Sequence, residues 1–335
     1  MAISDLIAAP SAAVLARAAA LLRDGALVAF PTETVYGLGA DARNEDAVRA
    51  IFAAKGRPAD HPVIVHLAET TQMDAWACNV PPAGRALAAA FWPGPLTLIV
   101  PRARGVGDVV TGGQDRVGLR VPSHPLARQL LRAFGAAGGD GIAAPSANRF
   151  GRISPTTAAH VADDLGMAVA MILDGGECDV GIESTIIAFD DDDEPMLLRP
   201  GGLAAEDIAR VLGRAPRRPD AQAPRASGTL ASHYAPRTPA RLLAASDLAR
   251  AALRGGNRAA VLARTVARPA GFAGHWIGAP QEVGRFAHDL YANLRLLDAV
   301  DANEILVEDV PADAAWLAVR DRITRAAHAE EDDRD

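Results

Sequence analysis

A short apolar run that ends at a proline and continues into hydroxyl-bearing residues limits the folds open to this chain. Residues 26–30 (ALVAF) have the length and composition of a buried strand, and Pro31 ends its pairing because proline has no backbone N–H to donate. Residues 32–36 (TETVY) then place polar groups at the carboxyl end of that strand, where open α/β sheets bind their ligands. We expect half of a binding site here, although a polar connection to the next helix would explain any two of these residues.

Residues 37–42 (GLGADA) match a dinucleotide-binding fingerprint, G-x-G-x-x-A. That fingerprint requires its first glycine directly after the strand, whereas six residues separate Phe30 from Gly37. We therefore reject it and expect the glycines to form a turn. The sequence also has no Walker loop, so any phosphate must be bound in another way.

Length and charge bound the class of protein. A chain of 335 residues, half of them hydrophobic, is long enough for two domains with buried cores. The formal net charge of -7 argues against a protein that coats nucleic acid, for which a basic domain is typical. Any anion site must therefore be local.

The spacing of the cysteines and the lack of a recognisable targeting signal predict a reducing compartment. Cys78 and Cys178 lie far apart, without metal-ligand spacing, and predict neither a disulfide framework nor a metal site. The first residues lack the pattern of a signal peptide, and no apolar run reaches the length of a membrane span. We expect a cytoplasmic protein.

Cations and histidines follow the first predicted helices. Ser11 and Asn44 can each cap a helix, and the second helix ends near Gly56, at the run Lys55-Gly-Arg57-Pro58. Cations at a helix C-terminus are favoured by the helix dipole, so a simple charge cap competes with a role in binding anions. His66, on the predicted strand 63–67, is a polar ring among apolar neighbours, and a hydrogen-bonded structural histidine is the alternative to a functional one.

Arg120 stands in the middle of a predicted strand at residues 117–121. If its face of the sheet is buried, the guanidinium needs a carboxylate, because an unpaired buried charge is costly. The sequence leaves open whether the protein or a substrate supplies that carboxylate.

Two further strand ends carry small polar residues. Residues 141–148 repeat the order of strand, proline and hydroxyl or amide groups, which makes Ser146 and Asn148 candidates for phosphate binding, with an ordinary turn as the alternative. Ser184 lies near the start of the strand-rich run 181–189, and Arg199 is a candidate anion contact. The acidic block 190–194 between them predicts a solvated hairpin tip.

The organisation of the chain changes after residue 212. Residues 213–239 are rich in proline, arginine and alanine without apolar periodicity, and we interpret them as a linker or lid that contains the pair His233 and Tyr234. Alternating strands and helices from residue 240 predict a second α/β unit, and the acidic end of the chain predicts a disordered tail. The predicted domains are therefore 1–212 and 240–335, joined by 213–239.

Taken together, the motifs resemble the Sua5/YrdC family, and more closely its two-domain Sua5 type. The motifs that carry the resemblance are PTETVYGL (31–38), KGRP (55–58), VIVH (63–66), WPGPLT (92–97), APSAN (144–148), ESTI (183–186), LRPG (198–201) and HYAP (233–236). The resemblance implies a YrdC-like twisted, open, mixed sheet with a concave cavity, followed by a smaller Rossmann-like domain. It also implies L-threonylcarbamoyladenylate synthase activity, a nucleotidyl transfer from ATP, L-threonine and bicarbonate that serves the t6A modification of tRNA.

The resemblance assigns residues to both substrates. Lys55 and Arg57 would act in catalysis. The implied ATP contacts are Thr32, Arg57, His61, Gly118, Ser146, Asn148, Arg199 and Tyr234. The implied threonine contacts are Thr34, His66, Arg120, Ala144 and Ser184. Magnesium would accompany ATP, held by phosphates and water without a named protein ligand. The expected partners are other t6A-pathway proteins, with no membrane and with direct tRNA contact left open.

Two alternative functions, from other classes of protein, stay open. A concave cationic surface is also typical of an RNA-binding module, although the acidic total charge weakens that interpretation. Related domains of hydrogenase-maturation proteins transfer a carbamoyl group, but the acylphosphatase and zinc-finger segments of those proteins are not visible here.

Overall fold

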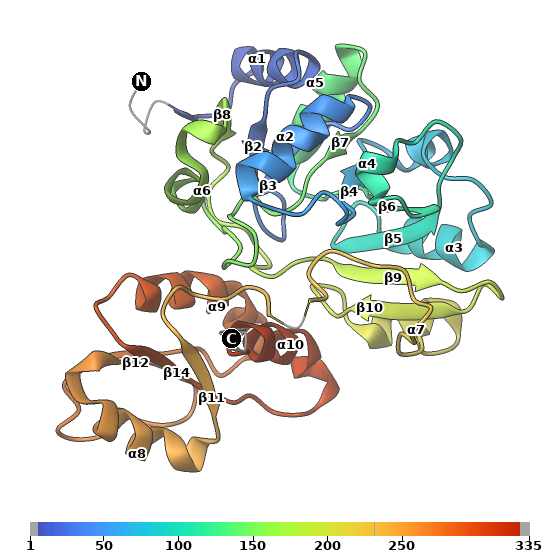
Figure 1. Cartoon of the computed structure of the whole chain (residues 1–335). Coiled ribbons are helices and arrows are strands. Elements are labelled where there is room, and N and C mark those ends of the chain that lie inside the picture. Colours follow the sequence, from blue (N-terminus) through green and yellow to red (C-terminus); the bar gives the residue numbers. More distant parts are fainter. Residues whose placement is uncertain (1–5, 231, 329–335) are drawn as a thin grey trace, which may run out of the picture. The chain divides into compact units, whose positions relative to one another are not determined.

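The structure is a computed structural model that describes residues 6–230 and 232–328 (Figure 1). It divides into two compact units, each of which is described by itself. Described residues through Phe150, together with Pro155–Thr229, form the first unit, and Gly151–Ser154 with the described residues from Leu230 form the second. The predicted linker is thus shared, since its residues through Thr229 lie in the first unit. The predicted tail at 330–335 lies outside the described residues.

Strands of the first unit pair in one mixed sheet. Its order over the described residues is β1-β8-β2-β3-β7-β4-β6-β5-β9-β10. The strands are β1 (Ile7–Ala8), β2 (Val28–Phe30), β3 (Gly37–Asp41), β4 (Ile64–His66), β5 (Leu96–Pro101), β6 (Arg116–Arg120), β7 (Ile142–Ala143), β8 (Met171–Leu173), β9 (Thr185–Phe189) and β10 (Pro195–Arg199). Strands β4 and β6 are parallel neighbours, and β7 pairs antiparallel with β4 on its other side. The mixed α/β sheet predicted for this part is confirmed.

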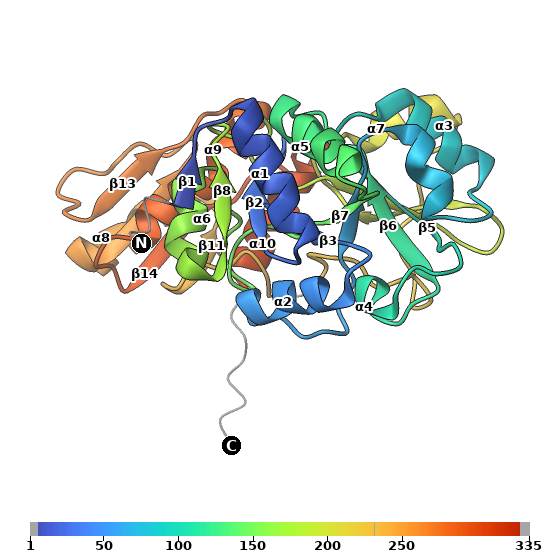
Figure 2. The same cartoon turned by 90° about the horizontal axis from the view of Figure 1, so that it is seen from above.

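Helices cover both faces of this sheet. They are α1 (Ala12–Arg23), α2 (Glu45–Lys55), α3 (Pro82–Phe91), α4 (Asp108–Thr111), α5 (Pro125–Ala136), α6 (Ala158–Leu165) and α7 (Ala205–Leu212), with short 3-10 turns at Thr70–Ala75 and Gly166–Ala168. Helices α1 and α5 pack side by side on one face (Figure 2), where Val28 and Phe30 meet them. Ala29 points to the opposite core, which also contains residues of α2. The two-residue period of a strand explains this alternation.

Helix ends follow the capping residues predicted from the sequence. The Ser11 hydroxyl accepts a hydrogen bond from the Val14 N–H at the start of α1, and the Asn44 side chain accepts from two N–H groups at the start of α2. Gly56 ends α2 with a φ of 64°, a left-handed conformation that glycine adopts without steric cost. Both predicted caps are confirmed.

The glycine run 37–42 is not the turn that we expected. Gly37–Asp41 form β3, which pairs antiparallel with β2. A Cβ atom on Gly39 would lie 2.9 Å from Phe30 Cε1 and 3.0 Å from Ile142 Cγ2. These glycines therefore allow neighbouring strands to carry large side chains, and the turn is made by the polar residues 31–36 instead.

The second unit contains a smaller parallel sheet of order β11-β14-β12-β13 over its described residues. Its elements are β11 (Ala240–Leu243), α8 (Ala245–Gly255), β12 (Ala259–Ala263), β13 (His275–Gly278), α9 (Val283–Asp298), β14 (Glu304–Glu308) and α10 (Leu317–Ala326), with 3-10 turns at Gly256–Arg258 and Ala314–Trp316. The predicted second α/β unit is confirmed, although strand β13 escaped prediction. None of the described helices of the chain is long and apolar enough to cross a membrane.

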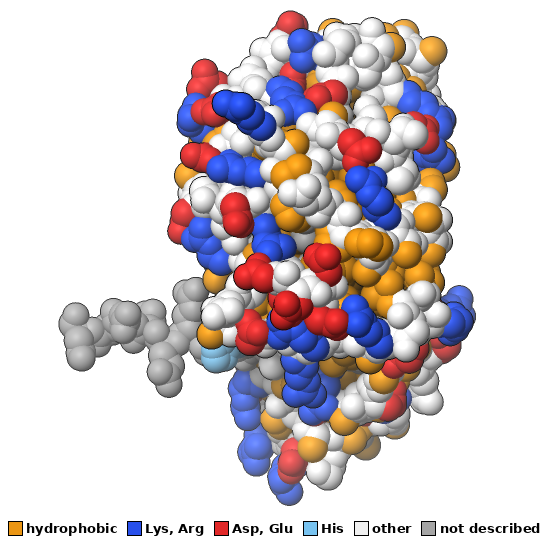
Figure 3. Space-filling view, turned by 90° about the vertical axis from the view of Figure 1, so that its right-hand side faces the viewer, with side chains coloured by type: hydrophobic (Ala, Val, Ile, Leu, Met, Phe, Trp, Pro, Cys, Tyr) orange, Lys and Arg blue, Asp and Glu red, His pale blue; other side chains and the backbone are white. Residues whose placement is uncertain are grey.

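The acidic block forms the predicted hairpin tip. Residues 190–194 connect the antiparallel strands β9 and β10, and the Asp190 carboxylate accepts hydrogen bonds from the N–H groups of Asp192 and Glu194. Arg217 forms an ion pair with Asp190 at 2.7 Å. Figure 3 shows acidic and basic side chains gathered on the face toward which this hairpin points.

Candidate active site in the first unit

Strands β4 and β6 bring together two of the residues predicted to bind the substrate threonine. His66 and Arg120 are partners in the parallel register of these strands, and their exposed fractions are 3% and 4%. Each is the last residue of its strand and follows a buried apolar residue, Val65 in β4 and Leu119 in β6. The sheet therefore places a ring nitrogen and a guanidinium next to each other in a buried position.

Arg120 has a carboxylate partner within the protein. Its Nη2 donates a hydrogen bond of 2.7 Å to Glu33 Oε1, and Glu33 Oε2 accepts one of 3.0 Å from the Ser123 N–H. Burial alone would raise the pKa of Glu33, but the charge and hydrogen bond of Arg120 outweigh it, so the pKa lies below its ordinary value. Of the two carboxylate sources that the sequence left open, the structure contains the protein's own.

His66 is neutral at physiological pH. Burial, together with the neighbouring Arg120 charge, lowers its pKa to about 3. Among the described residues, no hydrogen-bond partner is found for His66 Nδ1 or for Arg120 Nε, although both atoms are buried. Buried polar atoms are nearly always paired, so these two mark a place where the polar groups of a small ligand would fit.

Arg199 and Ser184 form a second buried polar group. Arg199 Nε and Nη2 donate to the Ser184 carbonyl oxygen at 3.1 and 2.9 Å, and the Ser184 hydroxyl lies 2.8 Å from Thr97 Oγ1. Arg199 Nη1 also donates to the Ser227 carbonyl oxygen at 2.8 Å. The predicted anion contact is thus held by backbone oxygens of two separate segments.

Lys55 is buried, with 3% of its surface exposed, and it is the only lysine in the sequence. Its Nζ donates to the carbonyl oxygens of Ser146 and Asn148 at 2.5 and 2.6 Å. Burial, and then the nearby Arg57 charge, lower its pKa well below the ordinary value. An exposed charge cap at the end of α2 is therefore excluded. Instead, Lys55 joins α2 to the predicted phosphate-binding loop.

Arg57 and His61 follow α2 in the chain and are half-buried. Arg57 Nη2 donates to the Pro62 carbonyl oxygen at 2.7 Å and to Ser227 Oγ at 3.3 Å. The His61 ring packs edge-on against Phe150, with 5.4 Å between the ring centroids. Burial and the Arg57 charge lower the pKa of His61, so this ring is also neutral at pH 7.

The remaining predicted residues take part in the turn and the strands around the site. Thr32 Oγ1 lies 2.8 Å from Thr34 Oγ1 and donates to the Val35 carbonyl oxygen, which closes the turn between β2 and β3. Gly118 pairs with Ile64 in the sheet, and the Ala144 N–H donates to the Ile64 carbonyl oxygen.

Tyr234 belongs to the second unit, whereas the other residues predicted to bind substrates belong to the first. Its ring is 1% exposed, stacks on Tyr291 with 5.8 Å between centroids, and lies 4.9 Å below the Arg322 guanidinium. In this conformation the ring packs in a core. Contact with ATP, and closure of 213–239 as a lid, stay predictions.

Two residues of the site were not among the predicted contacts. Glu33 belongs to the polar loop 32–36. The sequence could have indicated its role, because a buried strand arginine needs a carboxylate and Glu33 is the acidic residue of that loop. Ser227 lies in the proline-rich segment after α7, where no sequence pattern marks it.

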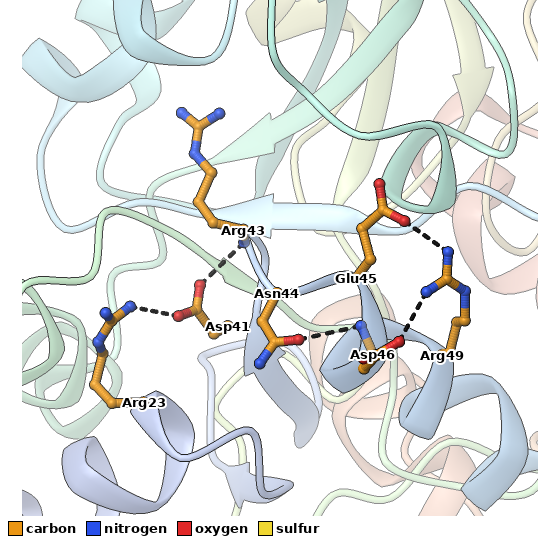
Figure 4. Close-up of a pocket in the computed structure, with 7 residues that line it drawn as sticks. All are labelled: Arg23, Asp41, Arg43, Asn44, Glu45, Asp46 and Arg49. Carbon is orange, nitrogen blue, oxygen red and sulfur yellow. Dashed lines mark hydrogen bonds and ion pairs between the residues drawn. The ribbon is translucent and has the colours of Figure 1, made fainter.

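A separate hollow of about 580 Å³ lies where α2 begins (Figure 4). The charged groups that line it have partners: Arg23 pairs with Asp41, Arg49 with Glu45 and Asp46, and Arg43 with Asp140 outside the hollow. None of the predicted site residues lines it. The Arg23–Asp41 pair joins α1 to β3, and the Arg49 pairs lie within the first turns of α2, so we attribute them to the structure of this part of the fold.

Comparisons with known proteins agree over nearly the whole chain. The family model described as Telomere recombination, which covers Sua5, YciO and YrdC proteins, matches residues 20–201. The model described as Threonylcarbamoyl-AMP synthase, C-terminal domain, matches residues 203–328.

Individual relatives are similar over both units. A protein of Bacillus subtilis named threonylcarbamoyl-AMP synthase is 41% identical over 93% of this chain and 92% of its own length. A protein of the same name from Pyrococcus abyssi is 47% identical over 65% of this chain and 64% of its own length. The crystal structure of Pyrococcus abyssi Sua5 complexed with L-threonine superposes with a TM-score of 0.86 and 36% identity, over 96% of this chain and 97% of that one.

Proposed function

The chain belongs to the Sua5/YrdC family, in its two-domain Sua5 form, and from this premise we propose that it is a threonylcarbamoyl-AMP synthase. The observation that carries the proposal is the buried pair His66 and Arg120, in a chain similar along its length to synthases. Each of the two side chains has one buried nitrogen atom without a partner in the described part of the chain. The reaction would convert L-threonine, bicarbonate and ATP into threonylcarbamoyl-AMP and pyrophosphate.

Threonine would bind at His66 and Arg120. The guanidinium has donors left for the amino-acid carboxylate, and the neutral imidazole can exchange one hydrogen bond with a polar group of the substrate. Thr34, Ser184 and the Ala144 carbonyl would complete this end of the site. Glu33 compensates the charge of Arg120 and His66 is neutral, an arrangement that suits a zwitterionic substrate.

ATP would bind along Lys55, Arg57 and Arg199. The threonine amine takes up carbon dioxide, derived from bicarbonate, to form a carbamate with loss of a proton. A carbamate oxygen then attacks the α-phosphorus, and pyrophosphate leaves with the electron pair of the broken P–O bond. Such a transfer requires no protein nucleophile, only positioning and cations that stabilise the leaving group.

The remaining ATP contacts would be Thr32, His61, Gly118, Ser146, Asn148 and Tyr234. Magnesium would enter with ATP, held by the phosphates and water, because this ion keeps most of its hydration shell. We further propose that the protein works in the cytoplasm and passes the adenylate to enzymes that complete the t6A modification of tRNA.

A pyrophosphate-release assay tests the proposal. Release should require threonine, bicarbonate and ATP together, and omission of any one should abolish it. Pyrophosphate release without threonine would contradict the assignment. Salt-dependent RNA affinity without turnover would favour an RNA-binding module, and turnover with carbamoyl phosphate in place of bicarbonate would favour a carbamoyl transferase.

A further inference from the structure

Glu33 has no role so far beyond pairing with Arg120. It stands in the turn between β2 and β3 and is almost completely buried. One carboxylate oxygen accepts from Arg120 Nη2 and the other from the Ser123 N–H, so both oxygens are held in place. A carboxylate fixed in this way cannot rotate to follow a ligand, and its position relative to the guanidinium is constant.

The charges of the Glu33, Arg120 and His66 side chains cancel. Glu33 is ionised at neutral pH because Arg120 holds its pKa low, and Arg120 is always protonated. His66, the third buried group, is uncharged because burial and Arg120 keep its pKa near 3. Before a ligand enters, these three residues together therefore carry no net charge.

A guanidinium that is already compensated distinguishes between two kinds of carboxylic acid. A simple carboxylate would bring a second negative charge to a guanidinium that is already compensated, in a buried region where charges interact strongly. An amino acid brings an ammonium group as well, so that the two positive and two negative charges balance. Unfavourable pairing with the wrong ligand is a general source of specificity.

We propose that Glu33 is a specificity-determining residue: it neutralises Arg120 so that the site at His66 and Arg120 accepts a zwitterionic amino acid and rejects carboxylates that lack an amino group. The proposal rests on threonine binding at Arg120, as inferred above. It gives Glu33 a part in substrate selection in addition to orienting the guanidinium.

Isothermal titration of the full-length protein with L-threonine and with 3-hydroxybutyrate tests this role. The second compound has the carbon skeleton and hydroxyl group of threonine without its amine. We expect the wild type to prefer threonine by at least about tenfold in Kd, and Glu33→Gln to reduce this preference by about tenfold or more. Glu33→Asp, which keeps the charge, should retain most of the preference.

Glu69→Gln is the matched control. Glu69 also pairs with arginines, Arg128 and Arg132, but on the surface of the first unit. This variant should bind both compounds as the wild type does, and a similar loss of preference in it would overturn the proposal.

Two further results would overturn it. One is a wild type that binds both compounds equally, which needs no variant and so does not depend on folding of Glu33→Gln. The other is a folded Glu33→Gln protein in which both Kd values rise by the same factor, as a purely structural role predicts. Failure of the proposed function would look different, because threonine would then bind selectively without pyrophosphate release from the complete mixture.

Discussion

Arg120 makes different contacts from the residues assigned to ATP. Its contribution to threonine binding can therefore be measured separately from ATP binding. Its guanidinium pairs with Glu33, whereas Lys55 and Arg199 are held by backbone carbonyls. A substitution at Arg120 should therefore act on one substrate only.

Replacement of Arg120 by alanine should raise the threonine KM by about tenfold or more, because a charge-assisted hydrogen bond contributes ~1.5–3 kcal/mol. It should also lower the free energy of unfolding by about 3 kcal/mol, since Glu33 is left buried without its partner. Steady-state kinetics and chemical denaturation measure the two effects. An equal rise in the ATP KM would indicate a general folding defect instead.

The buried, neutral His66 should make stability depend on pH. Its pKa is about 3 in the folded protein and 6.5 ordinarily, so between these values the unfolded chain binds a proton that the folded one does not. Stability should therefore rise with pH in this window, by up to about 1.4 kcal/mol per pH unit from this residue. Above pH 6.5 the contribution is complete, and it is lost as the pH falls toward 3.

Denaturation of His66→Gln between these pH values measures that contribution. The variant should lose less stability on acidification than the wild type, while the matched variant His275→Gln, at an exposed position of β13, should behave as the wild type does. Parallel pH profiles of the wild type and His66→Gln would contradict a neutral, buried imidazole.

Lys55 is predicted to stabilise the loop at 146–148 as well as to serve ATP. Lys55→Met keeps the length of the side chain but leaves two carbonyl oxygens without their donor, which should cost about 1–3 kcal/mol of stability. Arg57→Ala, at a half-buried position, should change the melting temperature less and lower kcat. If Lys55→Met melts as the wild type does, the two short hydrogen bonds do not hold this loop.

Polar residues inside apolar strands are what sequence analysis detects well at the residue scale. It singled out Arg120 and His66 because charge or polarity is unusual between hydrophobic neighbours, and both lie buried next to each other. It did not pair Arg120 with Glu33, because the two are 87 positions apart and only the packing of the sheet joins them.

At the level of elements, Gly39 tests why β3 is rich in glycine. Alanine at this position should be destabilising by about 1–3 kcal/mol, since its Cβ would press against Phe30, Ile142 and the Val28 carbonyl. Gly135, in helix α5, is the matched control because a Cβ there meets nothing within 4 Å. Gly135→Ala should be stabilising by roughly 0.5–1 kcal/mol. Denaturation curves of both variants decide the question, and equal effects would exclude steric crowding at Gly39.

Helices with capping residues were predictable from local signals, as α1 and α2 show. The exceptions are strands whose reason lies elsewhere in the chain. Strand β3 carries glycines because its neighbours are large, and β13 is a short, partly exposed strand that pairs only with β12 within the described sheet. Neither reason is visible in the local sequence.

On the scale of the whole molecule, the segment after α7 belongs with the first unit. Ser227 donates to the Pro62 carbonyl oxygen at 2.9 Å and contacts both Arg57 and Arg199. The sequence predicted this segment as linker because it has no apolar periodicity. Its contacts are polar, and no periodic pattern accompanies them.

Truncation at two positions tests this division. A chain that ends at Thr229 keeps Ser227, whereas one that ends at Leu212 loses it. We expect the longer chain to bind ATP about fivefold more tightly or better. The shorter chain loses one or two hydrogen bonds that orient Arg57 and Arg199, which accounts for the difference. Equal affinities would mean that these contacts do not organise the ATP site.

The central claim, that the first unit joins bicarbonate, threonine and ATP, is tested most directly by the identity of the product. The full-length protein is incubated with threonine, ATP and ¹³C-labelled bicarbonate, and the adenylate is analysed by mass spectrometry. We predict a threonylcarbamoyl adenylate that carries the label in the wild type and is greatly reduced in Arg120→Ala. An active protein whose adenylate contains no label, or no threonine, would contradict the account.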